Sequence, residues 1–186
     1  MFKIIPTLTL LTFNFCFASS DAVPFRALTQ VAYTEDLTTI TLDDGSVWET
    51  KDYPSCAEAA LWSVNDPILI YPSKDIFVKE EYSLYNEQLR TFSHVNLLST
   101  SKSNLPTFLS ISNIDCDKNI ISLENISKEK IYFDITASQL ENWRVGDAII
   151  LGWNKDMGAG SDLKYPYILI NTPNKNFAKA SYIQPI

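Results

Sequence analysis

A nine-residue segment occurs twice in this chain, and this duplication constrains the fold more than any other feature. Residues 62–70 read WSVNDPILI and residues 143–151 read WRVGDAIIL, so both contain the frame Trp-x-Val-x-Asp-x-Ile. Ungapped pairing of residues 36–75 with 117–156 gives ten identities, where chance would give roughly two or three. The pairing continues with a shift of 85 residues, which aligns Asn86 with Asn171 and Phe92 with Phe177. We therefore expect two copies of one unit of about 75 residues, each able to form a small core.

Within each unit, short runs of alternating apolar residues are separated by turn residues, a pattern that predicts β-strands. In the first unit the expected strands are 27–33, 38–42, 47–50, 68–71, 82–85 and 91–98, and in the second they are 108–114, 119–123, 130–135, 148–151, 165–171 and 177–183. Asp-Gly at 44–45 predicts a tight hairpin, because these residues tolerate positive φ angles. Pro54 should end the third strand. A short helical turn is expected at 57–62, with Ser55 as its N-cap, and another at 138–143, where Ser138 and Glu141 have capping-box spacing.

The two frames Ile-x-Leu-[Asp/Glu]-[Asp/Asn]-x-Ser and Trp-x-Val-x-Asp-x-Ile resemble the repeats of SH3-like barrels, and of uncharacterised exported bacterial proteins that carry such repeats in tandem. The resemblance covers nearly all of the chain after residue 20. It implies an all-β protein of two tandem SH3-like antiparallel barrels, each with one short helical turn. The barrels would span residues 21–100 and 107–186, joined by a linker at 101–106. Because these motifs are structural, the resemblance implies no catalytic residue.

Residues 1–18 differ from the rest of the chain and have the features of a secretory signal peptide. Lys3 provides a positive start, and residues 4–17 are mostly apolar. Ala18 ends a sequence suited to signal-peptide cleavage. About fourteen apolar residues are too few for a comfortable membrane span, and the bulky Phe15 argues against lipidation of Cys16. The sequence therefore predicts a periplasmic or secreted protein, cleaved near Ala18.

The charge is distributed unevenly between the two units. Residues 21–100 contain 13 Asp/Glu and 5 Lys/Arg, whereas residues 101–186 contain nine of each. An acidic chain repels phosphate backbones, which argues against nucleic acid as a partner. The acidic first unit suits either a basic partner or simple solubility, and solubility is the simpler interpretation.

Two cysteines, Cys56 and Cys116, remain after removal of the signal peptide. In an oxidising compartment such a pair is a candidate disulfide. The bridge would join the two units and close a loop of about 60 residues, which the chain-entropy model values at several kcal/mol. Sequence spacing does not establish whether the two Cα atoms come close enough to pair.

The aromatic and acidic residues that recur in both units are predicted to be structural. Trp62 and Trp143 should each fill a barrel, with the indole N–H donating to a backbone carbonyl. Asp66 and Asp147 should cap turns by accepting backbone N–H groups. An acid–base role for these carboxylates is the alternative.

Aromatic residues that do not recur are the better candidates for an exposed ligand-binding surface, because the fold itself does not require them. These are Trp48, Tyr71, Tyr82, Trp153 and Tyr165. The single histidine, His94, is expected to be an exposed strand residue, because no partner for it is recognisable in the sequence. No metal site or cofactor is predicted.

The function that fits these observations is an exported, non-enzymatic binding or envelope-associated protein. Its ligand would be a protein surface, a peptide or a cell-wall glycan. One alternative is a small secreted hydrolase that uses Asp66, Asp147 and Asp156. Another is a secreted virulence factor that acts on a host protein. A continuous surface groove would favour binding, and a closed pocket with two carboxylates would favour the hydrolase.

Overall fold

The computed structural model describes residues 28–36, 38–73, 81–100, 104–136, 140, 142–154 and 164–184. Several features predicted from the sequence lie outside these ranges. They are the signal segment 1–18, part of the linker at 101–103, the pair Ser138 and Glu141, and Asp156.

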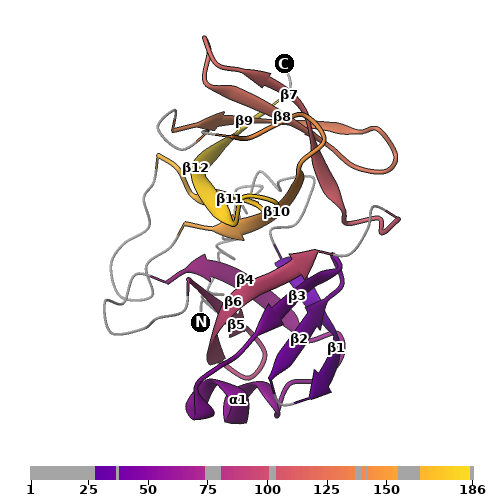
Figure 1. Ribbon diagram of the computed structural model, residues 1–186, viewed down its shortest axis with the longest axis vertical. Coiled ribbons are helices and arrows are strands. Elements are labelled where there is room, and N and C mark those ends of the chain that lie inside the picture. Colours follow the sequence, from indigo (N-terminus) through magenta and orange to yellow (C-terminus); the bar gives the residue numbers. More distant parts are fainter. Residues whose placement is uncertain are drawn as a thin grey trace, which may run out of the picture.

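The first unit is a closed antiparallel barrel at the lower end of the molecule in Figure 1. Its elements are β1 (Leu28–Asp36), β2 (Thr39–Leu42), β3 (Ser46–Glu49), α1 (Tyr53–Ala59), β4 (Pro67–Pro72), β5 (Tyr82–Asn86) and β6 (Thr91–Thr100). The strand order is β1-β2-β3-β6-β5-β4. Pairing of Leu28 with Leu69 closes the barrel between β1 and β4.

The second unit repeats this barrel with the same strand order. Its strands are β7 (Leu109–Asp115), β8 (Ile120–Glu124), β9 (Lys130–Ile135), β10 (Ala148–Trp153), β11 (Tyr167–Asn171) and β12 (Asn176–Ile183). They follow one another as β7-β8-β9-β12-β11-β10, and pairing of Leu109 with Ile149 closes the barrel. Two closed six-stranded barrels with one connectivity confirm the all-β tandem architecture predicted from the repeat.

The two units differ in the hairpin that follows their second strand. In the first, Gly45 has a φ of +81° and its N–H donates to Leu42 O at 3.0 Å, which makes the tight turn predicted for Asp-Gly. In the second, a longer turn is stabilised by Asn125, whose Oδ1 accepts from the N–H of Glu129 at 3.0 Å. Both hairpins agree with the sequence prediction.

The helix α1 begins earlier than the sequence suggested. Asp52, and not Ser55, is its N-cap, because Oδ2 of Asp52 accepts from the N–H of Ser55 at 3.1 Å. Pro54 lies in the first turn, where its missing N–H costs nothing. The proline therefore helps to start the helix. Ser55 is buried and bonds to β6, through its Oγ to the N–H of His94 at 2.9 Å. Among the described residues, no helix is long and apolar enough to cross a membrane.

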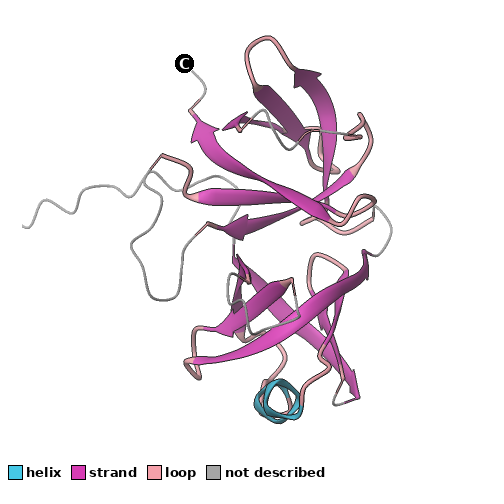
Figure 2. Cartoon of the chain, turned by 60° about the vertical axis from the view of Figure 1, so that its left-hand side comes forward, coloured by secondary structure: helices cyan, strands magenta, loops and turns pink. Residues whose placement is uncertain are grey.

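The barrels are stacked, and the sheet β10–β11–β12 of the second lies across one end of the first (Figures 1 and 2). The outward side chains Ile150, Ile168 and Ile170 belong to the apolar cluster of the first barrel, and their inward neighbours fill the second. Thr100 and Thr172 also contact each other across this interface, with their hydroxyl oxygens 3.3 Å apart. The interface is thus continuous with the core of the first barrel.

Candidate functional site

The recurring tryptophans are core residues, as predicted. Trp62 and Trp143 are each 6% exposed. The indole N–H of Trp62 donates to the hydroxyl of Thr91 at 2.9 Å, and that of Trp143 donates to Oδ1 of Asn176 at 2.8 Å. Both acceptors are side chains at the start of the last strand, so the predicted bond to a backbone carbonyl is wrong.

The recurring aspartates form a duplicated polar network. Oδ2 of Asp66 accepts from the N–H of Ser63 at 2.8 Å and from the amide of Asn86 at 2.7 Å. In the second barrel Asp147 makes the same bonds to Arg144 and Asn171, each at 2.8 Å. These carboxylates cap the turn before the fourth strand of each barrel, as predicted. Since each is held within its own barrel, they do not form a shared carboxylate pair.

One end of the first barrel is sealed by the second barrel. We call this end of each barrel its mouth. In the first barrel it contains Trp48 and Tyr82, whose rings meet edge to face with centroids 5.4 Å apart. Tyr82 also contacts Phe177 of the second barrel at 6.3 Å. Both mouth residues are buried, and the indole of Trp48 donates to Oγ of Ser46 at 2.7 Å. The prediction that Trp48 and Tyr82 are exposed binding residues is therefore wrong.

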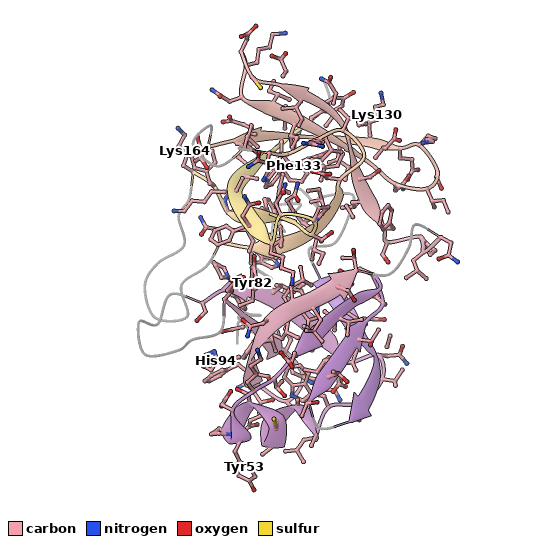
Figure 3. All side chains as sticks on the ribbon, in the orientation of Figure 1. Tyr53, Tyr82, His94, Lys130, Phe133 and Lys164 are labelled. Carbon is pink, nitrogen blue, oxygen red and sulfur yellow. The ribbon has the colours of Figure 1, made fainter. Side chains whose placement is uncertain are left out.

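The mouth of the second barrel carries the equivalent residues, and among the described residues no other barrel covers it. Phe133 and Tyr167 occupy the places of Trp48 and Tyr82, and the ring centroids of Phe133 and Tyr167 are 6.2 Å apart. Figure 3 shows Phe133 within the ring of strands and Lys164 near its edge. Phe133 is fully buried, whereas Tyr167 is half-buried.

Two further aromatic residues surround this mouth. Tyr182 contacts Phe133 at 6.0 Å, and Trp153 lies tilted against Tyr167 at 5.2 Å, both measured between ring centroids. Trp153 and Tyr182 are half-buried like Tyr167, whose pKa is raised by partial burial. We define Trp153, Tyr167 and Tyr182 as the open mouth. Tyr165 lies beside it, with the ammonium of Lys164 4.8 Å from its ring centroid.

The polar end of Trp153 is the chemically unusual feature of the open mouth. Its Nε1 is buried and has no hydrogen-bond acceptor among the described residues. The other three indole N–H groups all have one. Because a buried donor without an acceptor costs about 1–3 kcal/mol, the site is suited to a ligand that presents an acceptor oxygen.

The first barrel has a second candidate surface, on the outer side of β4, β5 and β6. We call it the outer face, and its residues are Leu69, Tyr71, Ser83, Tyr85, Phe92 and His94. By strand register these match the residues of the second barrel that pack on the first, namely Ile150, Gly152, Ile168, Ile170, Phe177 and Lys179. The two faces are therefore equivalent in the fold, but the face of the second barrel is mostly aliphatic and that of the first contains Tyr, Ser and His.

Tyr71 and His94 both have close partners on the outer face. Tyr71 is only 5% exposed and contacts Tyr85 edge to face at 6.5 Å, so its predicted exposure is wrong. Burial, with smaller effects from Glu87 and Tyr85, raises the pKa of Tyr71 to about 12. His94 is half-buried, with Nδ1 2.9 Å from the hydroxyl of Ser83 and its ring 5.0 Å from that of Phe92. The prediction of a lone exposed histidine is thus also corrected.

The candidate disulfide does not form in the structure, where Cys56 and Cys116 are both free. Cys56 lies in α1 and has its sulfur 3.0 Å from the hydroxyl of Thr50. Cys116 is exposed directly after β7. Figure 1 places α1 and β7 at opposite ends of the molecule.

Of the ligand-binding residues predicted from the sequence, Trp153 and Tyr165 come together at the second barrel, whereas Trp48 and Tyr71 belong to the first. Sequence reasoning missed Tyr182 and Phe92 as surface residues. The identity of Phe92 with Phe177 was the available signal for the outer face. No protein-family model, no curated protein and no solved structure matches the chain.

Proposed function

We propose that the chain is an exported, non-enzymatic protein-binding module, and that its second barrel receives a segment of a partner protein in the open mouth. One observation carries this proposal. The mouth of the first barrel is covered by apolar side chains of the second barrel, whereas the mouth of the second barrel is lined by half-buried aromatic rings. The SH3-like character of the barrels and their likeness to exported bacterial repeats belong to the same proposal.

The chemistry of the two mouths supports a peptide as the ligand. Trp153 stands where the first barrel has Pro72, and Tyr182 where it has Leu97. These replacements add flat apolar rings with polar ends, a composition typical of interfaces that bind and release. An extended peptide provides both an apolar side chain for the rings and a backbone carbonyl for the unpaired Nε1 of Trp153.

Another copy of this chain is a poor ligand for the open mouth. Within the molecule, Gly152 lets the backbone of the second barrel come close to strand β4 of the first. A Cβ at this position would lie 2.8 Å from the carbonyl oxygen of Ile70. The outer face of the first barrel carries Tyr71 at the equivalent position. Because this position holds a Tyr side chain where the docked face has none, the two faces are not interchangeable, which favours a different protein as the ligand of the open mouth.

The indole N–H resonances provide a direct test of ligand binding at the open mouth. The mature chain, residues 19–186, would be used to select binders from a phage-displayed library of random peptides. A selected peptide should shift the Trp153 indole N–H resonance and leave that of Trp62 in place. Trp153→Ala should weaken binding by about tenfold or more, as expected for a central aromatic contact. The exposed Ile126→Ala, on a hairpin of the same barrel, is the matched control and should bind normally.

Parallel titration with a tetramer of N-acetylglucosamine tests the glycan alternative. If only the sugar shifts the Trp153 resonance, the ligand class is wrong. If neither probe affects Trp153, the open mouth is not the binding site.

The hydrolase is a second candidate, and one contact favours it. The hydroxyl of Ser83 lies 2.9 Å from Nδ1 of His94, within reach of a general base. Asp66 and Asp147 are engaged in turn capping, so Ser83 would be its nucleophile. A fluorophosphonate probe that labels the mature chain, but not a Ser83→Ala variant, would support the hydrolase over the binding module.

A further inference from the structure

Phe92 occupies the outer face of the first barrel without the partner that its equivalent has. The two units are identical at this position, and Phe177 packs against Tyr82 in the interface between the barrels. Phe92 is 43% exposed. In the second unit this position packs against the first barrel. In the first unit the same position is apolar and exposed.

The exposed apolar surface continues from Phe92 onto the adjoining helix and turns. Contacts between α1 and β6 bring the helix beside this strand, and Ser55 of α1 bonds directly to the backbone of His94. Tyr53 at the start of the helix is 84% exposed, and Leu61 after it is 67% exposed. Val64 and Leu89, in the neighbouring turns, are exposed as well. We name Tyr53, Leu61, Val64, Leu89 and Phe92 the apolar patch.

The first barrel, which carries the apolar patch, has a net negative charge. Residues 21–100 contain 13 Asp/Glu and 5 Lys/Arg. Of the cations near the patch, Lys51 is paired with Glu49 at 3.1 Å, and Arg90 is exposed in the turn beside Leu89. Glu58 lies on α1, and Glu87 is exposed in the turn that also holds Leu89. Such a field attracts cations and repels acidic proteins.

We infer that the apolar patch is a second docking site, which binds a basic segment of a protein through apolar side chains flanked by Lys or Arg. The site is separate from the open mouth, and it lies at the other end of the molecule's stacked barrels, where α1 is found (Figure 1). The apolar side chains of the partner cover Phe92 and Leu61, and its cations approach Glu58 and Glu87. With two sites of different chemistry, one chain can hold two proteins together.

The test uses the mature chain, residues 19–186, and phage-displayed random twelve-residue peptides. Peptides that bind a Phe92→Ser variant are removed first, and the rest are selected on the wild-type chain. The retained peptides should be enriched in Lys or Arg together with Leu, Phe or other apolar residues. Leu61→Ser and Phe92→Ser should each weaken their binding by about tenfold. Raising the salt concentration from about 50 to 500 mM should also weaken it, because exposed charge attraction is screened.

Two variants distinguish this site from other binding on the same chain. Ile126→Ser removes an exposed apolar residue from the second barrel, and Trp153→Ala alters the open mouth, so neither should change the affinity. Because Phe92 and Leu61 are exposed, their variants should keep the wild-type circular dichroism spectrum and melting temperature. The inference is overturned if no peptide depends on Phe92, if the selected peptides lack Lys and Arg, or if Trp153→Ala abolishes their binding.

Discussion

At the scale of single residues, several polar side chains form local hydrogen bonds that stabilise turns and the helix cap. Asp52 is an example, because its carboxylate caps α1 while its charge interacts favourably with the nearby His94. Partial burial disfavours the charged carboxylate. Hydrogen bonds from Ser55 and the proximity of His94 outweigh that effect, so the pKa of Asp52 lies below its ordinary value.

A pH titration of stability tests the role of Asp52. A carboxylate with a lowered pKa stabilises the fold above its ordinary pKa, and this contribution is lost as the pH falls through the lowered value. Asn caps helices about as well as Asp but does not titrate. Asp52→Asn should therefore have nearly wild-type stability near neutral pH and a smaller loss of stability between about pH 5 and 2.

Urea unfolding at a series of pH values measures this difference. Glu129→Gln changes a carboxylate in the hairpin of the second barrel and serves as the control. An acid response of Asp52→Asn identical to that of the wild-type chain would contradict the assignment.

At the scale of structural elements, each barrel is organised by the turn that leads from its Trp into its fourth strand. The turn requires a left-handed residue, which is Asn65 with φ +74° in the first barrel and Gly146 with φ +94° in the second. The Asp that follows accepts hydrogen bonds from the turn and from an Asn at the end of the next strand. The repeat therefore preserves one complete folding motif.

The stability of this motif can be compared with that of the open mouth. Trp143 is buried and hydrogen-bonded, so Trp143→Ala should lower the free energy of unfolding by about 3–5 kcal/mol. Trp153→Ala should have a much smaller effect, because the ring is only half-buried and its N–H has no acceptor to lose among the described residues. Urea unfolding followed by far-ultraviolet circular dichroism measures both. Equal losses would show that Trp153 belongs to the core.

At the scale of the whole molecule, the two barrels share apolar surface. Three isoleucines of the second barrel lie in the core cluster of the first, so neither barrel keeps all of its packing alone. The repeat in the sequence had suggested two separate units. The shared cluster instead predicts a single cooperative unfolding transition.

Gly152 is the residue on which this shared packing depends. A Cβ there would lie 2.8 Å from the backbone oxygen of Ile70 and 2.9 Å from Cγ1 of Ile168. Since a backbone carbonyl cannot move aside cheaply, Gly152→Val should separate the barrels and give two unfolding transitions and a larger radius of gyration. Scanning calorimetry and small-angle X-ray scattering would detect these changes.

Gly146→Ala is the matched control for Gly152→Val. Its φ of +94° makes alanine unfavourable, yet nothing lies within 4 Å of the added Cβ. It should therefore lower stability by about 1 kcal/mol through the backbone alone, while unfolding stays in one transition. A single transition in Gly152→Val with unchanged dimensions would contradict the shared core.

The sequence by itself determined the duplication, the strands, the two hairpin types and the structural roles of the recurring Trp and Asp residues. These features depend on neighbours close in the chain or on positions that the repeat marks twice, and such signals can be recognised in one sequence. Only the tertiary structure decided which aromatic residues reach the surface. Neither Trp48 nor Trp153 has a Trp at the equivalent position of the other unit, so the sequence does not distinguish them. In the structure the second barrel covers the mouth that contains Trp48, whereas Trp153 is half-buried. The difference arises because burial depends on which surface packs against which. Here the face that packs on the first barrel has Gly152, and the equivalent outer face of the first barrel has Tyr71.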